Sequence, residues 1–193
     1  MARTTLSLGG RLGVAVAVML WSAAAWSADK PSTCLECHRQ MEGAVRGPAA
    51  LFADDVHAQR GLSCADCHGG DPTSMDPAVA MDPATGFLGK PARQEIPQFC
   101  ARCHADPAYM RKYNPNLPTD QYAKYLTSQH GKRDSAGDPD VAVCTSCHSV
   151  HNIRSKKNPA SPVFPTNIPG TCAACHMDAN RMKRHGLPVN QYG

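Results

Sequence analysis

Apolar residues are unevenly distributed along the 193-residue chain, with one dense run near the N-terminus and scattered positions afterwards. The run Leu12–Leu20 follows basic residues and precedes a stretch rich in Ala and Ser. This pattern predicts a secretory signal peptide over residues 1–28 and one mature domain over 29–193. The run is shorter than the ~20 residues of a membrane-spanning helix, and an uncleaved membrane anchor is the alternative interpretation.

Strongly apolar residues are too few after the leader to build an ordinary core. Residues 29–193 hold 7 Leu, 3 Ile, 8 Val and 4 Phe, together 22 of 165 residues. They also hold 16 Pro and 12 Gly, which interrupt helices and strands. So few large apolar residues would suggest disorder, but the net charge is small for a disordered chain. We therefore expect something other than side chains to fill the centre of the fold.

Every cysteine belongs to a Cys-x-x-Cys-His motif, and the chain has five of these motifs. On one helical turn, residues three and four apart share a face, so two thiols can bond one porphyrin edge while the histidine reaches the iron. The motif is the attachment signature of c-type haem. The candidate haem-attaching cysteines are Cys34, Cys37, Cys64, Cys67, Cys100, Cys103, Cys144, Cys147, Cys172 and Cys175, and the proximal iron ligands are His38, His68, His104, His148 and His176.

Two other uses of the cysteines fit the pattern less well. Disulfides suit an exported, cysteine-rich chain, but they do not explain the histidine after each pair. Closed zinc sites take four ligands, whereas five motifs would offer fifteen. The sequence therefore predicts five covalently bound c-type haems with their irons. We expect a mainly α fold with extensive irregular loops and almost no sheet, wrapped around a stack of five haems.

An internal duplication relates residues of about 57–122 to residues of about 130–192. In each copy an Ile-Pro pair leads into a haem motif, and the copy ends in Gln-Tyr. A histidine precedes the other motif of each copy, namely His57 in the first and His130 in the second. The motif that begins at Cys34 stands in front as an extra.

Each iron has a second axial position, for which four further histidines are available. His57, His130 and His151 are predicted distal ligands, and His185 is a further candidate whose counterpart in the first copy is Tyr113. His151 follows a proximal histidine by only three residues, too close to cross to the other face of the same haem. We expect it to bind a neighbouring haem and to lock two haems together.

Nine histidines cannot fill ten axial positions. Methionine also binds haem iron, and Met41, three residues after His38, is the first candidate. The alternatives are Met75, Met81, a lysine such as Lys90, an open iron or a ligand from another chain. We expect the exceptional haem at His38 or at His176, because the second copy stops before the segment that delivers His130 in its sibling.

Several segments resemble the multihaem c-type cytochromes of anaerobic respiration, in the superfamily of cytochrome c3 and the donors to nitrite reductase. They include HAQRGLSCADCHGGDP, SQHG and CTSCHSVHNIRSKKNP. The resemblance implies an electron carrier in the periplasm or at the cell surface. Its implied partners are quinol-oxidising complexes, terminal reductases or other multihaem cytochromes. It also implies that the histidines matching His57, His130 and His151 are distal ligands.

A carrier is favoured over an enzyme, because most irons can have both axial positions filled. One alternative is a reductase of nitrite, hydroxylamine or sulfur oxyanions at an open iron, with basic residues such as Arg93, Arg102 and the run Arg181–Arg184 holding the anion. The other is a membrane-anchored quinol dehydrogenase subunit. Without the two leader arginines the formal charge falls from +4 to +2, and haem propionates lower it further. We expect no nucleic-acid partner and only an associative contact with membranes, and we leave the oligomeric state open.

Overall fold

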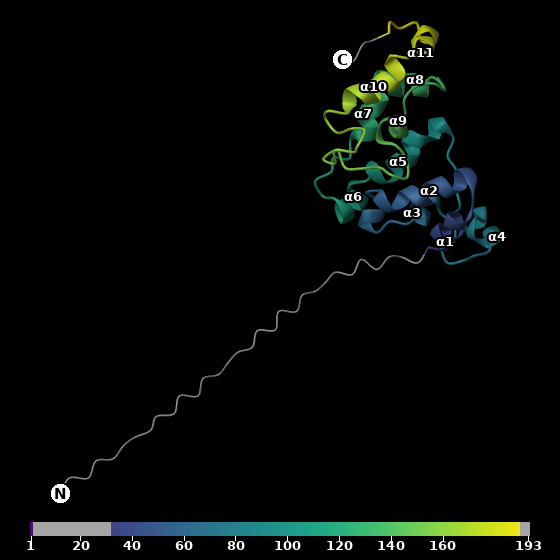
Figure 1. Ribbon diagram of the computed structural model, residues 1–193, viewed down its shortest axis with the longest axis vertical. Coiled ribbons are helices and arrows are strands. Elements are labelled where there is room, and N and C mark those ends of the chain that lie inside the picture. Colours follow the sequence, from purple (N-terminus) through teal and green to yellow (C-terminus); the bar gives the residue numbers. More distant parts are fainter. Residues whose placement is uncertain (2–31, 190–193) are drawn as a thin grey trace.

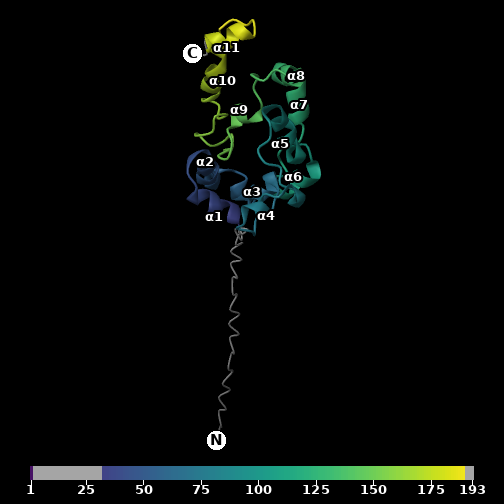
Figure 2. The same cartoon turned by 90° about the vertical axis from the view of Figure 1, so that its right-hand side faces the viewer.

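The computed structural model describes Met1 and residues 32–189. Within that part the chain forms short helices joined by long irregular segments and contains no strand, which confirms the expected fold class. The chain runs from α1 at one end of an elongated body to α11 at the other (Figures 1 and 2). No described helix is long and apolar enough to cross a membrane. Apart from Met1, the predicted signal peptide lies outside the described residues.

Eleven α-helices and five 3-10 helices occur in the described residues. The α-helices are α1 (Thr33–Gln40), α2 (Arg46–Leu51), α3 (Cys64–His68), α4 (Pro77–Ala80), α5 (Ile96–His104), α6 (Pro107–Tyr113), α7 (Gln121–Thr127), α8 (Gln129–Ser135), α9 (Cys144–His148), α10 (Ile168–His176) and α11 (Ala179–Arg184). The 3-10 helices are η1 (Gly43–Val45), η2 (Phe52–Asp54), η3 (Ala58–Arg60), η4 (Pro83–Thr85) and η5 (Arg93–Glu95).

The two Ile-Pro segments fold alike. Both begin a nine-residue helix, α5 or α10, with Pro in its first turn, where the missing N–H costs nothing. Both helices end at the motif histidine. An aspartate then caps the next helix, because Asp106 accepts the N–H of Ala108 and Asp178 accepts that of Arg181. The sequence therefore encodes the same pair of short helices twice.

The side-chain core is very small. The buried hydrophobic residues among those described are Ala49, Leu62, Met110, Val141, Val143 and Met182, and Pro97 of α5 is buried as well. Large apolar side chains such as Leu51, Leu88, Val150 and Met177 are exposed. Burial of apolar surface is the main driving force for folding. So small a core agrees with the expectation that a bound apolar group fills the centre.

Candidate functional site

The second and fourth haem motifs form the five-residue helices α3 and α9, which run from the first cysteine to the histidine. The residue after each histidine has positive φ, 69° at Gly69 and 64° at Ser149. In this region a residue other than glycine is strained, and such strain gathers at functional sites. The chain therefore turns sharply after both proximal histidines, even where the sequence supplies a serine.

The motif cysteines adjoin one another in chain order. Burial, and then the neighbouring thiol of Cys34, raises the pKa of Cys64. Burial, and then Cys103, raises the pKa of Cys67 to about 11. The thiols of the first and second motifs, and those of the second and third, are therefore near enough to influence each other's charge.

The same order continues to the C-terminal end. A hydrogen bond with Cys144, followed by burial, raises the pKa of Cys100. Burial, and then Cys172 and Cys175, raises the pKa of Cys147. Helices α5 and α9 are also in contact. The five motifs thus follow one another along the molecule, from α1 to α10 (Figure 2).

Three proximal histidines each face one histidine from outside the motifs. The ring centres of His57 and His104 are 6.0 Å apart. Those of His68 and His151 are 6.1 Å apart, as are those of His130 and His176. Each pair joins residues far apart in the sequence. The fold therefore places each of the three predicted distal ligands opposite a motif histidine of its own.

The spacing of these pairs fits a metal between the rings. A metal bonded at about 2 Å to one nitrogen of each ring would hold the ring centres about 6 Å apart. The angles between the ring planes are 82°, 28° and 54°, so the rings share a separation but not a stacking geometry. A common distance with variable rotation is expected when each ring turns about its bond to a shared metal. Together with the thiols and the small core, the spacing fits a covalently attached haem.

His151 reaches His68 through an unusual backbone. Its φ is 61°, and His151 and Ser149 are the only described non-glycine residues with positive φ. The two strained residues turn the chain back after α9, so that the His151 ring meets a histidine of another motif. On the other side, Nδ1 of His68 lies 2.9 Å from the Gly89 carbonyl oxygen and donates to it. That bond leaves Nε2 as the ring nitrogen with a free lone pair.

Burial favours the neutral, metal-binding form of three of the paired rings. Burial, and then His57 and His148, lowers the pKa of His104. Burial, and then His68, lowers the pKa of His151. Burial, and then His176, lowers the pKa of His130. A neutral imidazole keeps one nitrogen lone pair for a metal. These sites therefore present ligands without first losing a proton at neutral pH.

A buried carboxylate, Asp55, contacts His57, one of the predicted distal ligands. Only 1% of its surface is exposed, and its Oδ1 lies 2.8 Å from Nδ1 of His57. Burial by itself raises the pKa of Asp55, but hydrogen bonds from the side chain and backbone of His57 and from Ile153 outweigh it, so the pKa is lowered. Asp55 is therefore ionised at neutral pH and fixes which nitrogen of His57 faces away from it.

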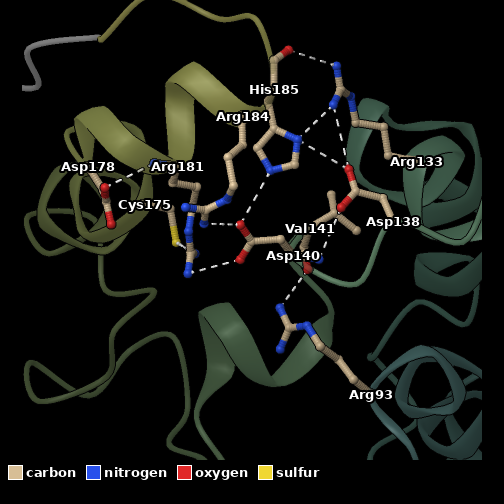
Figure 3. Close-up of polar contacts among 10 residues, drawn as sticks. All are labelled: Arg93, Arg133, Asp138, Asp140, Val141, Cys175, Asp178, Arg181, Arg184 and His185. Atoms are coloured by element: carbon tan, nitrogen blue, oxygen red, sulfur yellow. Dashed lines mark hydrogen bonds and ion pairs between the residues drawn. The ribbon is translucent and has the colours of Figure 1, made fainter.

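His185 lies in a charged cluster rather than opposite a motif histidine (Figure 3). Its Nδ1 is 2.9 Å from Arg133 Nη1 and 3.2 Å from Asp138 Oδ2, and its Nε2 is 3.7 Å from Asp140 Oδ2. Asp140 also pairs with Arg181 and Arg184. The cluster joins the end of α11 to the loop that leads into α9.

Two motif histidines have no histidine ring opposite them in the described part of the chain. These are His38 and the exposed His148. Met41 follows α1 directly and has 44% of its surface exposed, and Met75 and Met81 are exposed as well. The exceptional haem was expected at His38 or His176, and of these two His176 faces another histidine, His130, whereas His38 faces none in the described residues.

Two arginines that were considered as anion ligands donate hydrogen bonds to backbone carbonyl oxygens. Arg102 donates to the carbonyl oxygen of Cys67 at 2.6 Å, and so ties the third motif to the second. Arg93 donates to the Val141 carbonyl oxygen at 2.5 Å and to the Ser146 hydroxyl at 3.2 Å, at the fourth motif. These bonds link neighbouring motifs and use one terminal nitrogen of each guanidinium.

Sequence reasoning missed Asp55 and the carbonyl of Gly89. Asp55 stands two residues before His57, and that spacing next to a distal histidine was the one available signal. A carbonyl that accepts from a proximal histidine leaves no signal in the sequence, because every residue has one.

Comparisons with known proteins agree with this geometry. The cytochrome c3 family model matches residues 56–177, more than half of the chain. The chain is also similar to a C-type polyheme cytochrome, OmcC, of Geobacter sulfurreducens, with 21% identity over 181 residues. That alignment covers 84% of this chain but 22% of the relative's length. No solved structure matches. The chain thus belongs to the cytochrome c3 family of multihaem c-type cytochromes.

Proposed function

We propose that this protein is an electron carrier with five covalently bound c-type haems, three of which have two histidine ligands. The ligand pairs are His104 with His57, His68 with His151, and His176 with His130. The observation that carries the proposal is the shared ring separation of 6.0–6.1 Å in these pairs. Covalent attachment through the ten motif cysteines completes each site.

A haem iron with two histidine ligands takes up and releases one electron and offers no free position to a substrate. The residues of the chain set the positions of these irons and the order in which they adjoin. The motif thiols follow one another from the first motif to the fifth. Arg102 and Arg93 tie successive motifs through backbone carbonyls. A carrier in which motifs adjoin in series is suited to passing electrons from one end to the other.

We further propose that the chain is exported to the periplasm or to the cell surface. The apolar leader of residues 1–28 supports export. Its partners would then be a quinol-oxidising complex on one side and a terminal reductase or another multihaem cytochrome on the other. The commitment of Arg93 and Arg102 to carbonyl oxygens favours this role over reduction of an oxyanion.

The haem count is tested by the intact mass of the exported protein. We expect the mass of the processed polypeptide plus five haems, because all ten cysteines lie in attachment motifs. Acid–acetone should not extract the haems, since thioether bonds survive it. Replacing Cys64 and Cys67 together with Ser should remove one haem from the mass. A mass that corresponds to five disulfides and no haem would overturn the proposal.

We also propose that His185 stabilises the fold through ion pairs and does not bind iron. His185→Ala should leave the number of low-spin irons unchanged and lower the free energy of unfolding by about 1 kcal/mol, the usual net value of such a contact. Asp138→Asn, which removes a carboxylate facing the ring at 3.2 Å, should have a similar effect. Electron paramagnetic resonance and thermal unfolding measure the two quantities. A new high-spin haem in His185→Ala would instead identify a ligand.

A further inference from the structure

Asp55 accepts three hydrogen bonds from two segments far apart in the sequence. Its Oδ1 accepts from the His57 backbone N–H at 2.9 Å and lies 2.8 Å from Nδ1 of the same residue. Its Oδ2 accepts from the Ile153 N–H at 2.7 Å. The side chain is almost fully buried, with 1% of its surface exposed. Both carboxylate oxygens are thus occupied inside the protein.

These bonds tie together two predicted distal ligands. Ile153 follows His151 by two residues, and its carbonyl oxygen accepts the Val56 N–H at 2.8 Å. The segment that carries His57 is therefore fixed to the segment that carries His151. Asp55 lies at the junction, between the ligand of the third motif and the ligand of the second.

We propose that Asp55 positions these two distal ligands and lowers the reduction potential of the haem held by His104 and His57. The inference rests on the proposed function, because it needs His57 as an iron ligand. When Nδ1–H donates to a carboxylate, the other nitrogen faces the metal and the ring becomes a stronger base. A more basic ligand, next to a buried negative charge, favours ferric over ferrous iron.

The second copy of the duplication provides an internal comparison. Ser128 stands two residues before His130, as Asp55 does before His57. The backbone is nearly the same, with φ −76° and ψ 137° at Asp55 and φ −73° and ψ 164° at Ser128. The Ser128 hydroxyl accepts the Gly131 N–H and donates to the Tyr125 carbonyl.

Among the described residues, no carboxylate hydrogen-bonds the His130 ring. The haem of His176 and His130 should therefore have the higher potential of the two, because its distal histidine lacks the acidic partner that His57 has.

The experiment exchanges the carboxylate between the copies. Asp55→Asn removes the charge but keeps one oxygen that can accept from His57. It should shift the reduction equilibrium of one low-spin haem at least about tenfold toward the ferrous state, or 59 mV for one electron. Ser128→Asp keeps a good helix N-cap for α8 and adds a carboxylate. It should shift a different low-spin haem about tenfold the other way.

Potentiometric titration of the holoprotein, followed by electron paramagnetic resonance, measures each potential and counts low-spin irons. Unchanged potentials in folded, fully haem-loaded Asp55→Asn would overturn the inference. If Asp55→Asn does not fold, Ser128→Asp alone tests the inference. The absence of a downward shift in reduction potential in that variant would overturn it. His57→Ala is measured in parallel. If that variant keeps all its low-spin irons, the ligand assignment itself fails, and the fault lies with the proposed function.

Discussion

Replacing His130 with Ala should convert one low-spin haem into a five-coordinate, high-spin haem that binds carbon monoxide when reduced. The His130 ring lies 6.1 Å from that of His176, the separation that an iron between them requires. Two imidazoles make a strong ligand field, and the loss of one leaves an open axial position. Electron paramagnetic resonance of the oxidised protein counts the high-spin iron, and carbon monoxide uptake counts the open site.

The same change at His57 or His151 should open the haem of His104 or of His68. Each variant should lose one low-spin signal, and a variant with two of these changes should lose two. His130→Met should keep the iron low-spin with a raised potential, because methionine also binds haem iron. His185→Ala is the matched control, since its ring lies among charged residues. Unchanged low-spin spectra in all three alanine variants would show that these histidines are not ligands.

The haems of His38 and His148 should differ from the other three in the unmodified protein. Neither histidine has a histidine ring opposite it in the described part of the chain, and the one histidine left over, His185, is engaged with Asp138 and Asp140. Ligation by two histidines should therefore be complete at three irons. The remaining two should be high-spin, or should carry another ligand such as Met41.

Spin counting and cyanide binding test this second prediction. At an open iron we expect a high-spin signal that is lost on addition of cyanide, with no more than two cyanides bound per chain. If Met41 binds the iron of His38, a weak near-infrared methionine–iron band should be present and should disappear in Met41→Leu. Five irons that all show two histidine ligands at every protein concentration would contradict the prediction. A high-spin signal that appears only on dilution would show that a second chain donates the missing ligand.

The internal duplication predicted from the sequence accounts for part of the observed histidine pairing. His57 and His130 each precede one motif and face the histidine of the next, so the second copy repeats the arrangement of the first. His151 follows the fourth motif and faces the second. After the second motif, the position that matches His151 is Asp71, which has no imidazole ring to face a motif histidine. Counting histidines predicts that a ligand is missing, and the observed pairing leads us to expect the deficit at His38 and His148.

Attachment chemistry could be predicted from the sequence because it is local. Two cysteines and a histidine within five residues lie on one helical turn, and α3 and α9 consist of those five residues alone. The scarcity of large apolar residues likewise predicted a core made by something other than side chains, and the few buried apolar residues of the described segments agree with it. Counting left four candidate distal histidines, and the repeat layout together with the family resemblance favoured three of them.

Which distal histidine faces which motif depends on contacts between distant segments, and these exist only in the folded chain. The strained backbone at Ser149 and His151 turns the latter toward His68, although nothing in the local sequence demands positive φ there. His185 has the side chain of a ligand, but the fold places it beside Asp138 and Asp140, a contact that the sequence alone did not predict. Asp55 contacts His57 and Ile153 because folding removed its carboxylate from water and placed two N–H groups and a ring nitrogen around it. The sequence by itself thus determined the cofactor chemistry, which is set within single helical turns, while the tertiary structure decided which histidines face one another, which depends on distances across the fold.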